Sequence, residues 1–159
     1  MTASPGRSDI SIVGLQPEHA HALHTLETLC FSAPWSEADI AALCGDPRAV
    51  CFVALCKDEP VGYAGMFTVL DEGMMNNIAV HPAYRRQKIA RRLLQTLIRY
   101  CEENGVRELT LEVRRSNAAA LSLYEKEGFC RVGVRKDYYV SPREDALLYK
   151  KEIKCSTLQ

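Results

Sequence analysis

The chain has 159 residues, of which 47% are hydrophobic and 25% charged, a composition typical of one folded globular domain. Its 20 basic and 20 acidic residues cancel, which excludes the overall positive charge of a bulk nucleic-acid or anionic-membrane binder. The segment Met1–Leu15 lacks the regions of a secretion signal, and no apolar run approaches the roughly 20 residues of a membrane span. We therefore expect a single cytoplasmic domain, with a core at about residues 8–153 and a short C-terminal tail.

Cysteine and histidine usage argues against disulfides and metals. The seven cysteines are odd in number and contain no C-x-x-C pair, so we expect reduced thiols that serve mainly in packing. A catalytic thiol stays open as an alternative, although no cysteine has sequence neighbours that would lower its pKa. The four histidines lack zinc-binding spacing, and His21 and His24 are expected on a solvated helix face. The sequence therefore predicts no metal site.

Two helices follow the first predicted strand. Ser8–Gly14 is expected to be a strand and Pro17–Cys30 a helix. The helix carries one apolar stripe, which consists of Ala20, Leu23, Leu26, Leu29 and Cys30. Pro34 interrupts regular structure after this helix. Ser36 is then expected to cap a second short helix that reaches Leu43.

The middle of the chain reads as an antiparallel meander. Short turns at residues 57–60 and 71–73 separate apolar runs that are rich in strand-forming residues. The three predicted strands are Ala49–Cys56, Val61–Leu70 and Met74–Val80.

The helix that begins at Ile89 has the clearest periodicity. Its apolar residues keep 3, 4 spacing: Ile89, Ala90, Leu93, Leu94, Leu97, Ile98 and Cys101. Gly105 is expected to end it in a left-handed conformation. Leu109–Val113 alternates apolar and polar residues, which predicts a strand. The strand, helix, strand step from Met74 to Val113 requires a crossover and hence a parallel strand pair.

The remaining elements complete an α+β fold. Asn117 or Ser116 is expected to cap a helix that ends near Gly128. The chain then closes with two strands and a loop between them: Phe129–Lys136, Asp145–Lys151 and Ser141-Pro142. The predicted fold is a mixed, mostly antiparallel twisted sheet of about seven strands, flanked by about four helices.

A basic loop precedes the helix at Ile89. Four arginines lie at the helix start: Arg85, Arg86, Arg91 and Arg92. Unpaired N–H groups and the positive end of the helix dipole converge there, which favours a phosphate-rich ligand. A solvated basic face is the alternative, but cations at this end are unfavourable for the helix. No P-loop motif is present, and a nucleic-acid role lacks an aromatic stacking platform.

The same loop resembles the pyrophosphate loop of the GNAT superfamily, the GCN-related N-acetyltransferases. Arg85-Arg86-Gln87-Lys88-Ile89-Ala90 is similar to the pattern R/Q-x-x-G-x-G/A. Leu111–Glu125, followed by Gly128-Phe129, resembles the second half of that family's cofactor site. The resemblance implies the GNAT fold and acetyl-CoA as cosubstrate, with the backbone of residues 78–80 pairing with its pantetheine arm. The implied cofactor-binding residues are Ile78, Ala79, Val80, Arg85, Arg86, Gln87, Lys88, Ile89, Ala90, Arg91 and Asn117.

Further segments resemble the bacterial ribosomal-protein-alanine N-acetyltransferases, the RimI type within this superfamily. They are Ala33–Glu37, Asn77–Val80, Tyr138-Tyr139 and Arg143–Ala146. This resemblance implies that the acceptor is the N-terminal alanine of a small-subunit ribosomal protein, contacted by Trp35, Tyr138 and Tyr139. For Trp35, a hydrophobic staple at a helix start is an equal alternative. We expect a monomer or weak dimer that contacts neither nucleic acid nor membrane.

Lys88 departs from the family pattern, which has a glycine at this position. Glycine lets the backbone approach a ligand closely or take a positive φ. If Lys88 keeps a helical φ, its N–H can still face a phosphate; otherwise cofactor affinity is expected to fall. The reaction class does not depend on this residue.

Glu112 and Tyr124 are the catalytic candidates. Glu112 is the polar residue of an otherwise apolar strand, and the family match implies that it deprotonates the acceptor amine directly or through water. Without the resemblance, a solvent-facing carboxylate is the favoured interpretation. Tyr124 is implied to protonate the leaving thiolate of CoA, with an aromatic core residue as its alternative. Asn117 can serve as a helix cap and a cofactor contact at once.

Two other functions stay open. A GNAT enzyme that acetylates a polyamine, an aminoglycoside or an amino acid would share every cofactor residue, and only the regions of Trp35 and Tyr138-Tyr139 argue against it. A non-enzymatic acyl-CoA-binding module would be expected to lack Glu112 or Tyr124, and both are present.

Overall fold

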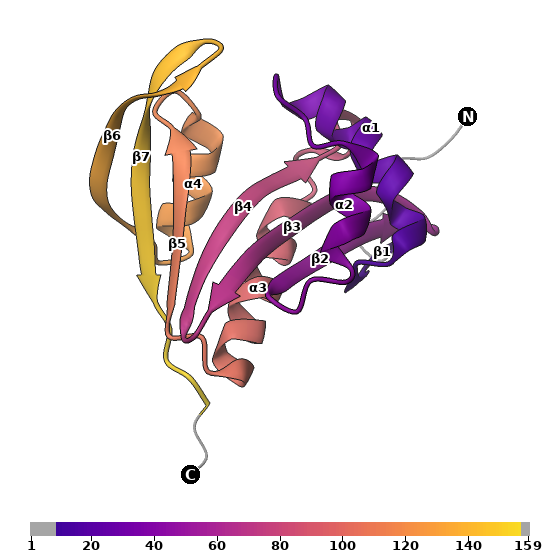
Figure 1. Cartoon of the computed structure of the whole chain (residues 1–159), viewed down its shortest axis with the longest axis horizontal. Helices are drawn as coiled ribbons and strands as arrows, with labels where there is room; N and C mark the ends of the chain where they lie inside the picture. Colours follow the sequence, from indigo (N-terminus) through magenta and orange to yellow (C-terminus); the bar gives the residue numbers. More distant parts are fainter. Residues whose placement is uncertain (1–8, 157–159) are drawn as a thin grey trace. The chain divides into compact units, whose positions relative to one another are not determined.

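The computed structural model describes residues 9–156, apart from the side chain of Asn77. This part of the chain contains seven strands and four α-helices, together with short 3-10 helices (Figure 1). In chain order the elements are β1 (Ile10–Gly14), η2 (Pro17–His19), α1 (Ala20–Cys30), α2 (Glu37–Leu43), β2 (Ala49–Cys56), β3 (Glu59–Val69), β4 (Glu72–Val80), η3 (Pro82–Tyr84), α3 (Ile89–Asn104), β5 (Glu108–Arg114), α4 (Ala118–Lys126), β6 (Cys130–Val140) and β7 (Arg143–Glu152). The predicted α+β class and order of elements are confirmed, while Ser8 lies outside the described residues.

The strands form one mixed sheet with the hydrogen-bonded order β1-β2-β3-β4-β5-β7-β6. The pairs β1–β2, β5–β7 and β6–β7 are antiparallel. β4 and β5 are parallel, with Glu72 opposite Glu108 and Met74 opposite Thr110. Because α3 connects these two strands, the parallel pair predicted from the strand, helix, strand step is confirmed.

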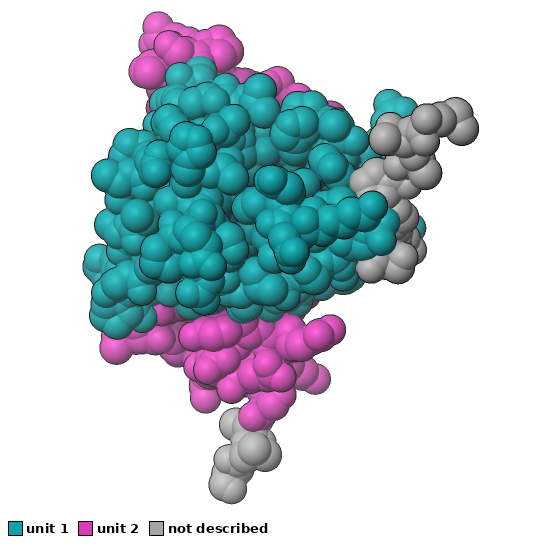
Figure 2. All heavy atoms as spheres, turned by 90° about the vertical axis from the view of Figure 1, so that its right-hand side faces the viewer, with its two compact units in different colours: residues 1–66, 77–97 teal, residues 67–76, 98–159 magenta. Residues whose placement is uncertain are grey.

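The chain divides into two compact units, which Figure 2 shows in different colours. Unit 1 comprises residues 1–66 and 77–97, and unit 2 comprises residues 67–76 and 98–159. Each unit therefore contains two separate stretches of the chain. The strands β3 and β4 and the helix α3 have residues in both units.

The core of unit 1 joins its two N-terminal helices to β2, β3 and β4. Its buried residues are Ala20, Leu23, Leu26, Ile40, Val53, Tyr63 and Ala79. The start of α2 is capped as predicted, because the Ser36 hydroxyl accepts a hydrogen bond from the N–H of Asp39. A Cβ at Gly62 would lie 2.9 Å from the carbonyl oxygen of Ala79. Glycine therefore lets β3 approach the end of β4 closely.

The buried face of α1 differs from the predicted stripe. Leu29 is 53% exposed, whereas Glu27 is only 1% exposed. The Glu27 carboxylate accepts hydrogen bonds from the N–H of Trp35 and the hydroxyl of Tyr63, which offset the cost of burying a charged group. The apolar pattern could not indicate this residue, because its partners lie elsewhere in the chain. The α-helix also begins at Ala20, after the 3-10 turn of η2, rather than at residue 17.

Unit 2 includes β5, β6, β7 and α4. Along β5, buried and half-buried residues alternate as predicted. Gly105 and Gly128 have positive φ angles of 73° and 92° and follow the ends of α3 and α4, as expected for left-handed helix ends. β6 is the last strand in the sheet order. Its side chains are largely exposed, including Val132 (61%) and Val140 (83%).

Several strands extend beyond their predicted limits. β6 continues to Val140 rather than to residue 136, and β7 runs from Arg143 to Glu152 rather than over residues 145–151. Only Ser141 and Pro142 remain as the turn between them. The turns flanking β3 likewise shorten to residues 57–58 and 70–71. Pairing between strands extends them through residues whose own strand preference is weak.

All seven cysteines lie in the described part of the chain and have free thiols. Burial raises the pKa of the Cys51 thiol to about 12 and that of the Cys101 thiol to about 11, so neither is a ready nucleophile near neutral pH. Within residues 9–156, no helix has the length and apolar character needed to cross a membrane. The same residues contain no group of three or more His, Cys, Asp or Glu side chains that could hold a metal ion.

Candidate active site

In unit 1, the end of β4 leads into residues 81–88, which we call the basic loop. The N–H of His81 donates to the carbonyl of Val61 at 2.8 Å, and its Nδ1 accepts from the N–H of Ala83 at 3.0 Å. Arg85 turns back onto the strand, because its Nε donates to the carbonyl oxygen of Val80 at 3.3 Å. These contacts fix the path of the loop between β4 and α3.

The last turn of the basic loop has a left-handed backbone. Arg86 and Lys88 have φ angles of +67° and +60°. Lys88 therefore does not keep a helical φ, and it takes the conformation for which glycine is best suited. The carbonyl of Lys88 accepts a hydrogen bond from the N–H of Arg92 at 3.1 Å, so α3 begins immediately after Lys88. The first N–H groups of such a helix have no partner within the helix and are available to an anion.

Replacing Lys88 by glycine is expected to stabilise the fold. A non-glycine residue in the left-handed region destabilises the fold by roughly 1–2 kcal/mol, and Lys88→Gly removes this cost. Glycine has more conformational freedom in the unfolded chain, which cancels part of the stabilisation. We expect the free energy of unfolding to rise by about 0.5–1 kcal/mol, measured by urea denaturation. As a control, Arg99→Gly in the exposed interior of α3 should lower it by about 1 kcal/mol. A loss of stability in Lys88→Gly would contradict the strained conformation.

The other residues expected to bind the cofactor lie on either side of this turn. Side-chain exposure along the segment is mixed: Ala79, Val80 and Ile89 are buried, Ile78, Gln87 and Ala90 are half-buried, and Arg85, Arg86, Lys88 and Arg91 are exposed. The Oε1 atom of Gln87 is buried and has no hydrogen-bond partner among the described residues. A buried acceptor without a donor is costly, so this atom suits a ligand that brings an N–H or O–H group.

In unit 2, Glu112 lies at the centre of a polar cluster that we call the Glu112 cluster, formed with Arg135, Tyr138 and Tyr139. The Glu112 side chain is 21% exposed, and its Oε1 lies 3.4 Å from the Arg135 Nε. A hydrogen bond to the Glu112 carboxylate is the main cause that raises the pKa of Tyr138. Burial, followed by the charge of Glu112, raises the pKa of Tyr139. Both tyrosines therefore stay protonated near neutral pH and can act as hydrogen-bond donors.

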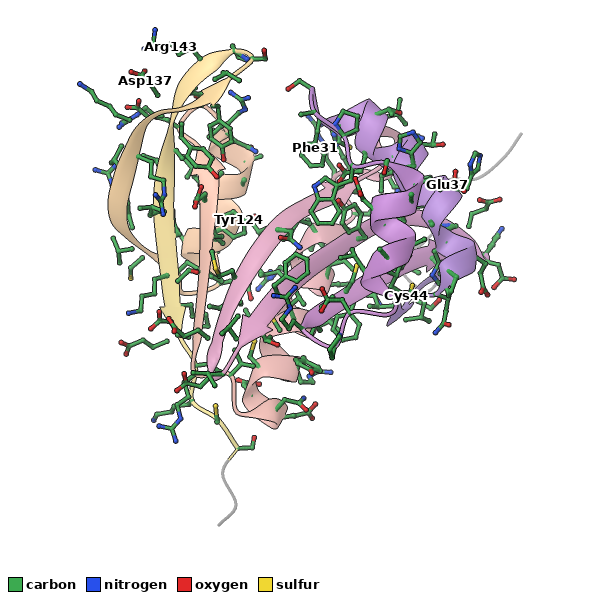
Figure 3. All side chains as sticks on the ribbon, viewed as in Figure 1. Phe31, Glu37, Cys44, Tyr124, Asp137 and Arg143 are labelled. Atoms are coloured by element: carbon green, nitrogen blue, oxygen red, sulfur yellow. The ribbon has the colours of Figure 1, made fainter. Side chains whose placement is uncertain are left out.

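An irregularity in β6 helps to place both tyrosines beside the same carboxylate. The register with β7 shifts between Arg135 and Tyr139, and Asp137 within this bulge has a φ of +53°. The N–H of Asp137 donates to the Asp145 carboxylate at 2.9 Å, and the Arg143 guanidinium donates to Asp137 at 3.1 Å. Figure 3 labels Asp137 and Arg143 at this end of the hairpin. In a regular strand, neighbouring side chains would point to opposite faces of the sheet.

Arg114 connects the hairpin turn to the end of β5. Its guanidinium donates to the carbonyls of Ser141 and Pro142 at 3.1 and 2.9 Å and to Glu144 at 3.2 Å. It also lies 4.2 Å from the centre of the Tyr139 ring. The second oxygen of Glu144 accepts the N–H of Ser116 at 2.6 Å. These contacts hold Tyr139 in a defined position beside the segment that follows Glu112.

Tyr124 is buried on α4 in unit 2 (Figure 3). Its ring lies 5.6 Å from that of Phe129. Burial, followed by the charge of Tyr139, raises the pKa of Tyr124 above its ordinary value. The side chain therefore packs as an aromatic core residue and retains its phenolic proton, so the two interpretations of Tyr124 are compatible.

Comparison with known proteins adds an independent observation. Residues 20–129 match the acetyltransferase (GNAT) family. The chain belongs to this family. Among its relatives, the [ribosomal protein bS18]-alanine N-acetyltransferase of Escherichia coli K12 is 39% identical over 140 residues, covering 87% of this chain and 94% of that protein. The corresponding enzyme of Haemophilus influenzae is 38% identical over 129 residues, covering 79% of this chain and 87% of that protein.

Solved structures of GNAT proteins agree with this assignment. The crystal structure of the ribosomal-protein-S18-alanine N-acetyltransferase from Escherichia coli has a TM-score of 0.85 and 37% sequence identity, and covers 93% of this chain and 96% of that chain. Arabidopsis thaliana NAA60 in complex with acetyl-CoA has a TM-score of 0.83 at 18% identity, covering 91% and 98% of the two chains. The second likeness supports the GNAT fold alone. The fold expected from the sequence resemblance is confirmed.

The remaining predicted residues of the GNAT site occupy two further places. Asn117 is the N-cap of α4, and its Oδ1 accepts the N–H of Ala120 at 3.1 Å, so its capping role is confirmed. Trp35 is half-buried and packs against the core cluster of unit 1, which includes Ile40. This packing supports a hydrophobic staple at the start of α2.

Within each unit, sequence reasoning did not assign roles to the residues that contact the predicted site residues or their neighbours. They are His24, Glu27, Arg114, Arg135, Glu144 and Asp145. Glu27 carried no local signal, because the groups that pair with it, the Trp35 N–H and the Tyr63 hydroxyl, lie elsewhere in the chain. His24 does not simply line a solvated face, since its Nδ1 lies 2.7 Å from the carbonyl oxygen of Trp35. The contacts of the other four depend on strand pairing, which one sequence does not reveal.

Proposed function

We propose that this chain transfers the acetyl group of acetyl-CoA to the N-terminal α-amine of ribosomal protein bS18, at an N-terminal alanine. The observation that carries the proposal is the 39% identity to the Escherichia coli bS18-alanine N-acetyltransferase, which extends over 94% of that enzyme. The sequence resemblance at Ala33–Glu37 and Tyr138-Tyr139, where the acceptor contacts are expected, supports the same acceptor. A small-molecule acetyltransferase would share the cofactor residues but would not require these segments.

The basic loop suits the phosphates and amides of acetyl-CoA. The N-terminus of α3 offers backbone N–H groups, and the loop adds the positive charges of Arg85, Arg86 and Lys88. The buried Oε1 of Gln87 fits an amide N–H donor from the ligand. Bound acetyl-CoA would supply the activated thioester carbonyl for the reaction. The residues expected to hold it are Ile78–Val80, Arg85–Arg91 and Asn117.

Glu112 is proposed to accept the proton of the acceptor amine, directly or through one water. An N-terminal amine has a pKa of about 7.7–8.0, so a useful minority of it is already neutral near neutral pH. A carboxylate then needs only to take a proton from the charged form or from the attacking nitrogen as the bond forms. Arg135 and Tyr138 both contact the carboxylate and orient it. The Glu112 cluster therefore supports general-base chemistry.

Tyr124 is proposed to give its phenolic proton to the sulfur of the departing thiolate. A thiol has a pKa of about 8.5, so a thiolate leaves more easily when a donor meets the developing charge. The raised pKa of Tyr124 keeps this proton in place until then. Transfer is proposed to be direct, without an acetylated enzyme, because the sequence shows no motif of an activated nucleophile. Burial also makes the thiols of Cys51 and Cys101 poor nucleophiles.

A panel of short peptides tests the acceptor. We expect acetyl transfer to a peptide with the N-terminal residues of bS18, and none to the same peptide with a blocked α-amine and a free lysine. Lysine, with a pKa near 10.4, is mostly protonated at neutral pH and is a weaker acceptor. Replacing the first alanine by a bulky residue should raise the KM for the peptide. Transfer to a free polyamine but not to the alanine peptide would favour the small-molecule alternative.

The same proposal extends to the organisation of the chain. We propose one catalytic domain of about residues 8–153, because β3, β4 and α3 have residues in both compact units. The partner is a ribosomal protein, so the enzyme is proposed to act in the cytoplasm, as a monomer or weak dimer.

A further inference from the structure

The segment between α1 and α2 contains a loop residue whose backbone is held on both sides by one helix. In unit 1, the N–H of Trp35 donates to the Glu27 Oε1 at 2.9 Å, and the carbonyl of Trp35 lies 2.7 Å from the His24 Nδ1. Both partners are side chains of α1, three residues apart, so they lie on neighbouring positions of one helix face. A loop residue outside regular structure needs such partners for its backbone groups.

The protonation of the two side chains follows from their partners. A backbone carbonyl can only accept a hydrogen bond, so the Nδ1 of His24 carries the hydrogen in this contact. A backbone N–H can only donate, so the Oε1 of Glu27 accepts. The second carboxylate oxygen of Glu27 accepts from the hydroxyl of Tyr63, which belongs to the core cluster of unit 1. Both carboxylate oxygens of Glu27 and both backbone groups of Trp35 thus have complementary partners.

Burying Glu27 is costly, and nothing in simple packing requires a carboxylate there. Its side chain is only 1% exposed, and burial raises its pKa although the Trp35 hydrogen bond and the nearby His24 oppose this shift. A leucine would fill the same core without a desolvation cost. A carboxylate at position 27 is explained if its role is to hold Trp35 in place, and not only to stabilise the fold.

We propose that His24 and Glu27 form a clamp on Trp35 that sets the affinity of the enzyme for its protein acceptor. This inference rests on the proposed function, in which Trp35 contacts the acceptor N-terminus. His24 and Glu27 are positioning residues, because they act through Trp35. The clamp fixes the backbone of Trp35 and its ring packs on the core cluster, so Trp35 presents a rigid surface. Acceptor binding then carries no entropy cost for ordering this loop.

Fluorescence tests the clamp without any substrate. Trp35 is the only tryptophan in the chain, so its emission reports on this loop alone. In His24→Ala and Glu27→Leu, we expect quenching of Trp35 by acrylamide to increase about twofold or more, since the loop opens more often. Glu27→Gln retains an acceptor for the Trp35 N–H and should stay near the unmodified protein. Thr28→Ala, on the exposed side of α1, is the matched control. Unchanged quenching in both clamp variants would overturn the clamp.

Kinetics with the bS18 peptide tests the consequence for the acceptor. His24→Ala should raise the KM for the peptide about tenfold while the KM for acetyl-CoA stays within about twofold. A purely structural role would lower the melting temperature and leave the peptide KM unchanged, and that result would overturn the proposal. If the unmodified chain acetylates no N-terminal peptide, the proposed function fails, and the acceptor part of this inference fails with it. The quenching result still decides whether the clamp holds Trp35.

Discussion

Glu112→Gln is expected to lower kcat for acetyl transfer by about 10²-fold or more, the usual contribution of a positioned general base. The amide keeps the shape of the side chain but cannot take a proton from the amine. The lost ion pair with the half-exposed Arg135 is worth only about 0–1 kcal/mol, so the variant should remain folded. Affinity for acetyl-CoA, measured by calorimetry, should change little.

Glu108→Gln provides the matched control for this prediction. Glu108 lies four residues earlier on β5, with its side chain on the same face of the strand, and it pairs with Lys150 at 3.1 Å. Losing that pair should leave kcat within about twofold, as expected for a surface contact. Rates should also be compared across pH, because the loss in Glu112→Gln should shrink where the amine is already neutral. Full activity of Glu112→Gln at neutral pH would remove this residue from the mechanism.

Tyr124→Phe is expected to reduce kcat by about 10²-fold, because it removes the proton proposed for the leaving thiolate. Phenylalanine retains the ring that packs against Phe129, so the core of unit 2 should be preserved. The KM values for both substrates should change much less than kcat, since the phenol acts as the thioester bond breaks. Single-turnover measurements would separate this step from product release.

Tyr149→Phe tests whether the loss of any buried phenol slows the enzyme. Tyr149 is a buried residue of β7 in the same unit, and its hydroxyl donates to Glu125 at 2.8 Å. This variant should lose about 1 kcal/mol of stability and retain its kcat. If Tyr124→Phe were as active as Tyr149→Phe, Tyr124 would be a packing residue only.

Much of the fold could be predicted because its signals are local. The apolar spacing of α3 and the alternation along β5 each depend on one helix face or one strand face. Gly105 and Asn117 mark helix ends through their own backbone or side-chain chemistry, and both occupy the expected positions. The parallel pair followed from the length of the connection alone.

The candidate site was less accessible to the same reasoning. Its catalytic and cofactor residues were suggested by family motifs, whereas the residues that orient them depend on pairs far apart in the sequence. Arg114 contacts the turn at residues 141–142, and Glu27 contacts Tyr63 across 36 positions. The bulge at Asp137 is equally hidden, because its positive φ is supported by Asp145 on the next strand. Local patterns carry no information about such partners.

The edge strand β6 bears on how this chain avoids pairing with other extended chains. Its outer backbone groups and its exposed valines would suit pairing with another extended chain, which is the first step of sheet-like aggregation. Two features oppose that outcome. The bulge around Asp137 breaks the straight register that a pairing strand would need, and the exposed Arg131 and Lys136 place positive charges on the same strand. The irregularity that helps to place the two tyrosines near Glu112 thus also makes this edge a poorer template for pairing with another strand.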